Sequence, residues 1–325
     1  MRRAAIRSIA LLSLLLLAAA LPADAAGVPP SNPCPQSLLK AVPARPPSAE
    51  TGSDFARRVA DLDESARERA IAAELLSGDI PAFLRALKPV RLRGALPSGR
   101  IVTITLCVMP DYLAIGSDRD FLRIPMRLGT ALAVAARFGF VLPTARVVDA
   151  IYDQAEVQLA PQPLPASDSM RSTAYYLTHD ALVRAQLEGR GAALGALVAG
   201  DKKDLVLTDE LRAMPGRIAI YGWHVSSGHP IQPLSLWHGK RYADYSHGAR
   251  LLSQIVLVND MQRSLYDVMG DPKLAPIVSG EGPIPLTRQL AARLAVAPEP
   301  ILRTAATAAP QQEAAIAGQR PLAQR

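Results

Sequence analysis

The spacing of apolar residues changes several times between residues 51 and 296, and this change limits the possible folds more than any other feature. From Phe55 to Leu76, apolar residues recur at intervals of three and four, which indicates helix. Residues 101–108 (IVTITLCV) are instead an uninterrupted β-rich run. Because helical and strand patterns continue in mixed blocks, we predict a single α+β domain over residues 51–296. Its mixed or antiparallel sheet is packed against several helices.

Turn and capping residues give the expected boundaries of the elements. Gly139 is predicted to end one helix and Thr144 to cap the next. The predicted helices cover residues 53–76, 83–87, 128–138, 144–157, 170–187 and 260–269. The predicted strands cover residues 101–108, 112–115, 121–124, 194–199, 204–208, 218–224 and 250–258.

The two ends of the chain have compositions of their own. Residues 1–25 combine an arginine-rich start, a 13-residue apolar run and the small residues of a cleavage site, which predicts a signal peptide. Thirteen residues rise about 20 Å as a helix, less than the roughly 30 Å of a bilayer core. Residues 26–50 are rich in proline and are predicted to form a linker, and residues 297–325 a disordered tail. We therefore expect an exported protein, periplasmic or secreted, with no membrane span after signal removal.

Charge and cysteine content limit the partners and the chemistry. The net charge of +7 is spread along the chain, without the blocks of basic and aromatic residues that a nucleic-acid groove needs, so no nucleic-acid partner is expected. Cys34 and Cys107 are the two cysteines, and in an oxidising compartment such a pair is often a disulfide. A pair of exposed lysines, Lys202 and Lys203, is most simply a solvated turn.

The candidate functional residues concentrate in one window, residues 221–247. It contains four of the five histidines and both tryptophans of the chain. Histidine exchanges protons near neutral pH and is the commonest metal ligand. Aromatic rings give flat faces for sugars or apolar groups. For any single histidine the pattern fits a structural role as well as a functional one. The cluster as a whole favours a functional site.

Three mechanisms are compatible with this window. In the first, His224, His238 and His247, with Asp244, hold a divalent metal such as zinc that activates water. In the second, Asp244 orients His247, which serves as general base to water or to the hydroxyl of Ser235.

In the third mechanism, the surface only binds a polymer. The expected binding residues are aromatic or basic: Trp223, Trp237, Tyr242 and Arg250. The sequence contains no Gly-x-Ser-x-Gly, His-Glu-x-x-His, Walker or Cys-x-x-Cys motif that would choose among the three.

Two resemblances accompany these patterns. The stretches Tyr221-Gly-Trp-His, Gln232-Pro-Leu-Ser and Tyr242-Ala-Asp-Tyr-Ser-His-Gly resemble an uncharacterised family of exported bacterial proteins without an assigned activity. Asp204-Leu-Val-Leu followed by Arg217-Ile-Ala-Ile-Tyr-Gly resembles two core strands of NlpC/P60-type cell-wall peptidases. The catalytic cysteine and histidine of those peptidases have no counterparts here.

The leading hypothesis is an exported hydrolase that acts on a cell-envelope or extracellular polymer. Its centre would be His224, His238, Asp244 and His247. The alternative is a non-catalytic envelope or polysaccharide-binding protein that uses the same aromatic and histidine surface. The sequence leaves the substrate and the presence of a metal open.

Overall fold

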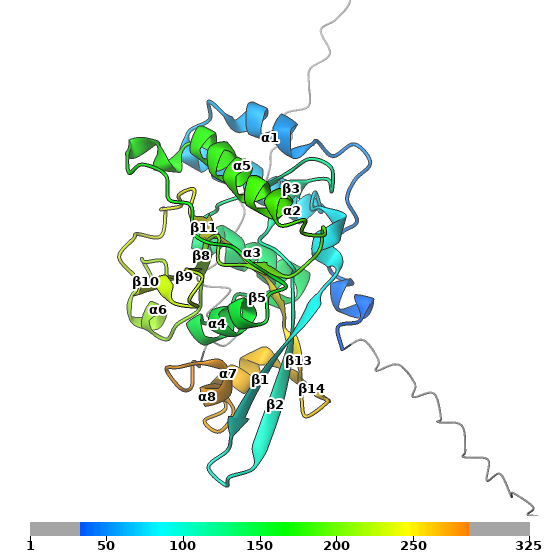
Figure 1. The fold of residues 1–325 in the computed structure, drawn as a ribbon, viewed down its shortest axis with the longest axis vertical. Coiled ribbons are helices and arrows are strands. Elements are labelled where there is room, and N and C mark those ends of the chain that lie inside the picture. Colours follow the sequence, from blue (N-terminus) through cyan, green and yellow to red (C-terminus); the bar gives the residue numbers. More distant parts are fainter. Residues whose placement is uncertain (1–32, 286–325) are drawn as a thin grey trace, which may run out of the picture. The chain divides into compact units, whose positions relative to one another are not determined.

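A computed structural model gives the structure of residues 33–285 (Figure 1). The predicted signal peptide and the predicted tail lie outside the described residues. Helices and strands alternate in mixed blocks, and both antiparallel and parallel pairs occur, so the α+β prediction is confirmed. No helix within residues 33–285 is long and apolar enough to cross a membrane.

The described residues contain eight α-helices and three short 3-10 helices. The α-helices are α1 Gly52–Val59, α2 Glu64–Ser77, α3 Leu128–Phe138, α4 Ala145–Asp153, α5 Thr173–Gly189, α6 Glu210–Ala213, α7 Leu265–Gly270 and α8 Ala275–Val278. The 3-10 helices are η1 Gln36–Leu39, η2 Ala82–Arg85 and η3 Asp168–Arg171.

The strands of the described residues form two larger sheets and two short pairs. The larger sheets use β1 Lys88–Ala95, β2 Ile101–Val108, β5 Phe140–Val141, β8 Lys203–Leu205, β9 Ile220–His224, β10 Pro230–Ser235, β11 His247–Gly248, β12 Leu252–Ser253, β13 Ile255–Val258 and β14 Met261–Ser264. The short pairs use β3 Ala114–Gly116, β4 Phe121–Arg123, β6 Val157–Gln158 and β7 Val198–Ala199.

The two larger sheets have different topologies. One has the strand order β14-β13-β2-β12-β5, with β1 paired to β2 in an antiparallel hairpin over the full length of both strands. The other has the order β10-β9-β8-β11, in which β11 runs parallel to β8 and the other pairs are antiparallel. Three of the four strands in this second sheet carry residues of the 221–247 window.

One large hydrophobic core connects these elements. Phe55 of α1, Ile71 of α2, Ile104 of β2 and Phe138 of α3 are all buried in it. Apolar residues of β8 and β9 belong to the same core, including Leu205. The strands that carry the window are therefore anchored in the interior of the domain, which fixes the loops between them.

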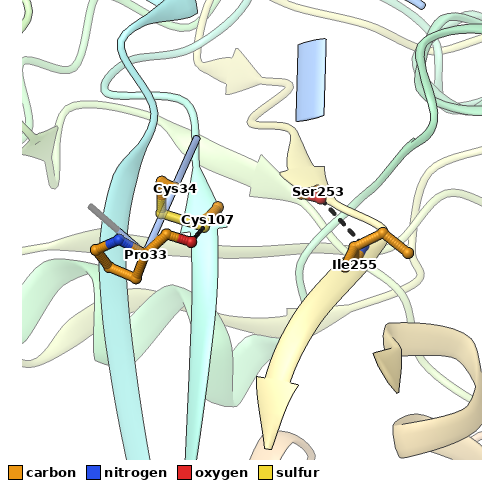
Figure 2. The surroundings of a disulfide bond; sticks show 5 residues. All are labelled: Pro33, Cys34, Cys107, Ser253 and Ile255. Carbon is orange, nitrogen blue, oxygen red and sulfur yellow. Dashed lines mark hydrogen bonds between the residues drawn. A yellow bond between two sulfur atoms is a disulfide. The ribbon is translucent and has the colours of Figure 1, made fainter. Parts of the chain in front are cut away.

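Residues 33–50, the described part of the predicted linker, are packed against the domain. Cys34 forms a disulfide with Cys107 of β2, with the two Cα atoms 5.4 Å apart (Figure 2), which confirms the predicted pair. Val42 is buried, and the Arg45 guanidinium donates to Asp79 at 2.7 Å. Proline content alone suggested an extended chain, but apolar and charged residues between the prolines attach residues 33–50 to the domain.

Several element boundaries differ from the prediction. The helix expected over residues 260–269 is strand β14 followed by the short helix α7. Asn259 and Asp260 both have positive φ angles, 47° and 65°, and form a tight turn that pairs β14 with β13. Strand β10, which contains two prolines, had no predicted counterpart. It lies at the edge of its sheet, where a missing N–H is tolerated.

Candidate functional site

The second sheet positions the histidine-rich window. Strand β9 ends at His224, and β11 begins at His247, next to β8 in the sheet. The chain between β10 and β11 is held by main-chain hydrogen bonds, from Ile218 N to the carbonyl of His238 at 3.1 Å and from His247 N to that of Asp244 at 3.1 Å. The side chains in this connection are consequently presented from a fixed backbone.

Four of the predicted site residues meet in one cluster: His238, Tyr242, Asp244 and His247. The rings of His238 and Tyr242 are stacked, with centroids 3.9 Å apart. The Tyr242 hydroxyl donates to Asp244 Oδ2 at 2.9 Å. His247 Nε2 lies 3.9 Å from Asp244 Oδ1, and the rings of His238 and His247 are 6.3 Å apart. We call these four residues the His/Tyr/Asp cluster.

Asp244 carries the negative charge of this cluster. Burial raises its pKa, but the neighbouring His247, the Ser246 hydroxyl and amide and the Tyr242 hydroxyl outweigh burial, so the pKa is lowered overall. Ser246 donates to Asp244 Oδ1 from its hydroxyl at 2.6 Å and from its backbone N–H at 2.8 Å. The carboxylate is thus ionised at neutral pH and is held by three hydrogen bonds.

The two histidines of the cluster differ in access to solvent. Burial lowers the pKa of His247 to about 4, so its ring is neutral at neutral pH. Both ring nitrogens are buried and have no hydrogen-bond partner among residues 33–285. His238 is partly exposed. Partial burial lowers its pKa, with the charge of Lys203 adding to this and that of Asp244 opposing it. His238 is therefore unprotonated near neutral pH and can accept a proton.

A cleft of about 630 Å³ adjoins the cluster. Tyr242, whose ring stacks on His238 and whose hydroxyl donates to Asp244, also lines this cleft. The remaining lining comes from the start of α2, from η3, from the residue that precedes α3 and from two loops: Asp63, Glu64, Ser65, Arg127, Arg171, Gly216, Gly239, Lys240 and Arg241. Cleft and cluster together form the candidate functional site.

No protein-family model, curated protein or solved structure matches this chain. The likeness to exported proteins and to NlpC/P60-type peptidases therefore stays a prediction.

His224 lies apart from the cluster. Its Nε2 is 2.9 Å from Asp149 Oδ1 of α4, and the Tyr221 hydroxyl donates to the same oxygen at 2.8 Å. The ring of Tyr152 stacks on His224 at 4.5 Å. Trp223, the preceding residue, has a φ of 58°, which is unusual for a bulky side chain and turns the end of β9. These contacts make His224 part of the packing between β9 and α4.

The predicted zinc site is not formed by the described residues. Among residues 33–285, no group of three or more His, Cys, Asp or Glu side chains is arranged to hold a metal ion. Of the three proposed ligands, His238 and His247 belong to the cluster, whereas His224 pairs with Asp149. The sequence spacing carried no information about this separation, because His224 ends one strand and His247 begins another.

The remaining predicted residues divide into buried and exposed groups. Arg250 is fully buried and donates to the carbonyls of Met109 and Val198. The indole N–H of Trp223 donates to the carbonyl of Asp201. Arg250 and Trp223 therefore stabilise the interior of the domain. The Ser235 hydroxyl accepts from Trp237 N at 3.3 Å and has no bond to a histidine in the described structure. Trp237 is 80% exposed and, with Tyr242, is available for binding.

A buried charge network beneath the site was not predicted. Arg123 is enclosed between Asp111 at 2.8 Å and Asp180 at 2.9 Å. Lys202, expected in a solvated turn, is buried, and its Nζ lies 3.0 Å from His179 Nδ1. Burial lowers the pKa of Lys202 to about 8. No local pattern marks such residues, since their partners lie far apart in the sequence.

Proposed function

We propose that this is an exported hydrolase that acts on a cell-envelope or extracellular polymer, with general acid–base chemistry at the His/Tyr/Asp cluster. The observation that carries the proposal is the position of Tyr242. Tyr242 lines the cleft, its ring stacks on His238, and its hydroxyl is 2.9 Å from Asp244. A cleft for substrate, an accessible neutral base and an ionised carboxylate are thereby joined through one side chain.

In the proposed reaction, His238 accepts a proton from water as the water attacks the scissile bond. The charge of Asp244 favours the protonated form of His238 and so stabilises the imidazolium that develops. The proton then passes from His238 to the leaving group, which restores the neutral ring. Tyr242 positions the His238 ring by stacking, and its bond to Asp244 fixes its own orientation.

The Cys34–Cys107 disulfide supports the export part of the proposal. Disulfides persist in oxidising compartments and are rare in the cytosol. An exported protein would encounter polymers outside the inner membrane without nucleotide cofactors, and hydrolysis needs only water as co-reactant.

A second candidate function is polymer binding without catalysis. The large exposure of Trp237 favours it, because an indole that is 80% exposed provides a flat surface for a ligand. This candidate needs the cleft and the exposed ring and makes no use of His238 as a base.

Cleavage of isolated envelope polymers tests the two candidates. Purified protein is incubated with peptidoglycan and with extracellular polysaccharide, and new reducing ends and amino groups are quantified. His238→Ala should reduce the release of these groups at least about 100-fold, the usual contribution of a general base. His229→Ala is the matched control, because His229 is exposed and lies outside the cluster and the cleft lining. Absence of release by the unmodified protein would leave binding as the function.

A further inference from the structure

Residues 239–242 line the cleft, and Trp237 and His238 directly precede them in the chain. The Arg217 guanidinium donates to the carbonyl of Trp237 at 2.6 Å, and Lys240 N donates to that of Gly216 at 2.8 Å. These bonds attach the segment to the loop that precedes β9. We call residues 237–242 the cleft loop. It carries the exposed indole of Trp237, the proposed base His238, two cations and Tyr242.

The cleft lining has more basic than acidic side chains. Arg127, Arg171, Lys240 and Arg241 are basic, whereas Asp63 and Glu64 are acidic. The two acidic groups are already engaged. Asp63 caps α2 by accepting from two backbone N–H groups, and Glu64 lies 3.0 Å from Arg171.

Lys240 and Arg241 are the cations that remain for a ligand. Both side chains are exposed, and within residues 33–285 neither forms an ion pair. Two adjacent unpaired cations at a cleft attract an anionic ligand and strengthen its binding at low salt.

Trp237 adds a second requirement for the ligand. The indole is 80% exposed, although the chain's other tryptophan, Trp223, is 6% exposed. The face of an aromatic ring carries partial negative charge and accepts the polarised C–H groups of a sugar ring. A ligand that satisfies both the indole and the two cations therefore combines sugar rings with negative charges.

We propose that the cleft loop selects an anionic polysaccharide, one whose sugar rings carry carboxylate or phosphate groups, as the polymer on which this site acts. A sugar ring lies on Trp237, and its acidic groups pair with Lys240 and Arg241 towards the cleft. The inference rests on the proposed function for the place of the ligand, and it adds the chemical class.

Calorimetric titration with defined polymers tests this assignment. Oligogalacturonate supplies sugar rings with carboxylates, phosphorylated mannan supplies rings with phosphates, and dextran of equal length supplies rings without charge. Polyglutamate supplies carboxylates without rings, and oligothymidylate represents a nucleic acid. We expect at least one acidic glycan to bind about tenfold or more tightly than the other three, a difference of 1.4 kcal/mol, and to weaken as salt is raised. Comparison of the two acidic glycans identifies the charged group.

Variants of the cleft loop assign the two contributions. Lys240→Gln combined with Arg241→Gln should weaken acidic-glycan binding about tenfold and flatten its salt dependence. Trp237→Ala should weaken it about five- to tenfold without changing the salt dependence. The matched controls are Arg263→Gln combined with Lys273→Gln, and Met261→Ala. These residues are exposed and outside the cleft lining, so binding should be unchanged.

Three results would overturn the assignment. Equal affinity for dextran and both acidic glycans would remove the role of charge, and equal affinity for polyglutamate would remove the role of the sugar ring. Tighter binding of oligothymidylate would assign the cleft loop to nucleic acid. Separate measurements of binding and of cleavage on the unmodified protein distinguish this inference from the proposed hydrolysis. Selective binding without cleavage by the unmodified protein would contradict hydrolysis and leave the ligand class intact.

Discussion

His247 is enclosed by groups that titrate or carry charge. Asp244 precedes it by three residues in the chain. Lys203 lies in β8, the strand paired with β11, and Lys202 is the residue before β8. The charges of both lysines, and that of His238 in the cleft loop, act on the His247 ring. Although Asp244 favours a charged ring, burial dominates and lowers the pKa of His247 to about 4. A neutral histidine beside an ionised Asp244 keeps the negative charge available for His238, which is the group with access to solvent.

The first prediction concerns the pH dependence of stability. The pKa of His247 is about 4 in the folded protein, compared with about 6.5 in an unfolded chain. Between these values the unfolded state binds the proton and the folded state does not. Stability is therefore fully present above pH 6.5 and is lost as pH falls towards 4, by up to about 3 kcal/mol. His247→Gln should remove this loss, which urea unfolding from pH 4.5 to 8 measures.

The comparison must isolate His247 from other buried groups. Burial raises the pKa of Asp204 to about 7, so Asp204 makes the unfolding free energy rise as pH falls below 7. This contribution is the same in the wild type and in His247→Gln, and it cancels when the two are compared. His229→Gln is the control, since His229 is exposed. If wild type and His247→Gln show the same slope of unfolding free energy against pH, His247 does not titrate as the structure implies.

Helices with clear caps were the elements that the sequence predicted best. Gly139 ends α3 with a φ of 78°, and the Thr144 hydroxyl accepts from Val147 N, both as expected. Strand β14 was mistaken for helix because four residues are too few to distinguish the two periods.

The His/Tyr/Asp cluster was predictable as a histidine concentration within one window. The pairing of His224 with Asp149 was not, because it depends on how β9 packs on α4.

The second prediction concerns the cap of α4. The Thr144 hydroxyl accepts from Val147 N at 3.2 Å and donates to the carbonyl of Val278 in α8 at 2.5 Å. Because both bonds are buried, Thr144→Ala should lower the unfolding free energy by about 2–3 kcal/mol. Ser172→Ala, which removes the partly buried cap of α5 and its bond to Tyr175 N, should cost only about 1 kcal/mol. Equal losses for the two variants in urea unfolding would contradict a role of Thr144 in joining α4 to α8.

At the scale of the whole domain, the N-terminal segment depends on long-range contacts. The disulfide joins residues 73 positions apart, and Arg45 attaches the same segment to Asp79 and to the carbonyl of Gly116. The cysteine pair was predictable from the cysteine count and the predicted compartment. The packing of residues 33–50 was not, because a proline-rich composition describes local stiffness and carries no information on tertiary contacts.

The last prediction tests this attachment. Closing a loop of this length stabilises a folded protein by about 4 kcal/mol, so Cys34→Ser with Cys107→Ser should lower the melting temperature by about 10 °C. The loss should also be local, because Cys34 lies next to η1, and Lys40 immediately follows η1. Limited trypsin digestion should therefore cut after Lys40 faster in the variant than in the oxidised protein, giving a fragment that begins at Ala41. Reducing the wild-type protein should reproduce the variant's behaviour. If the melting temperature falls while cleavage after Lys40 stays slow, the contacts of Arg45 and Val42 alone hold the segment, and the disulfide stabilises the domain only through the unfolded chain.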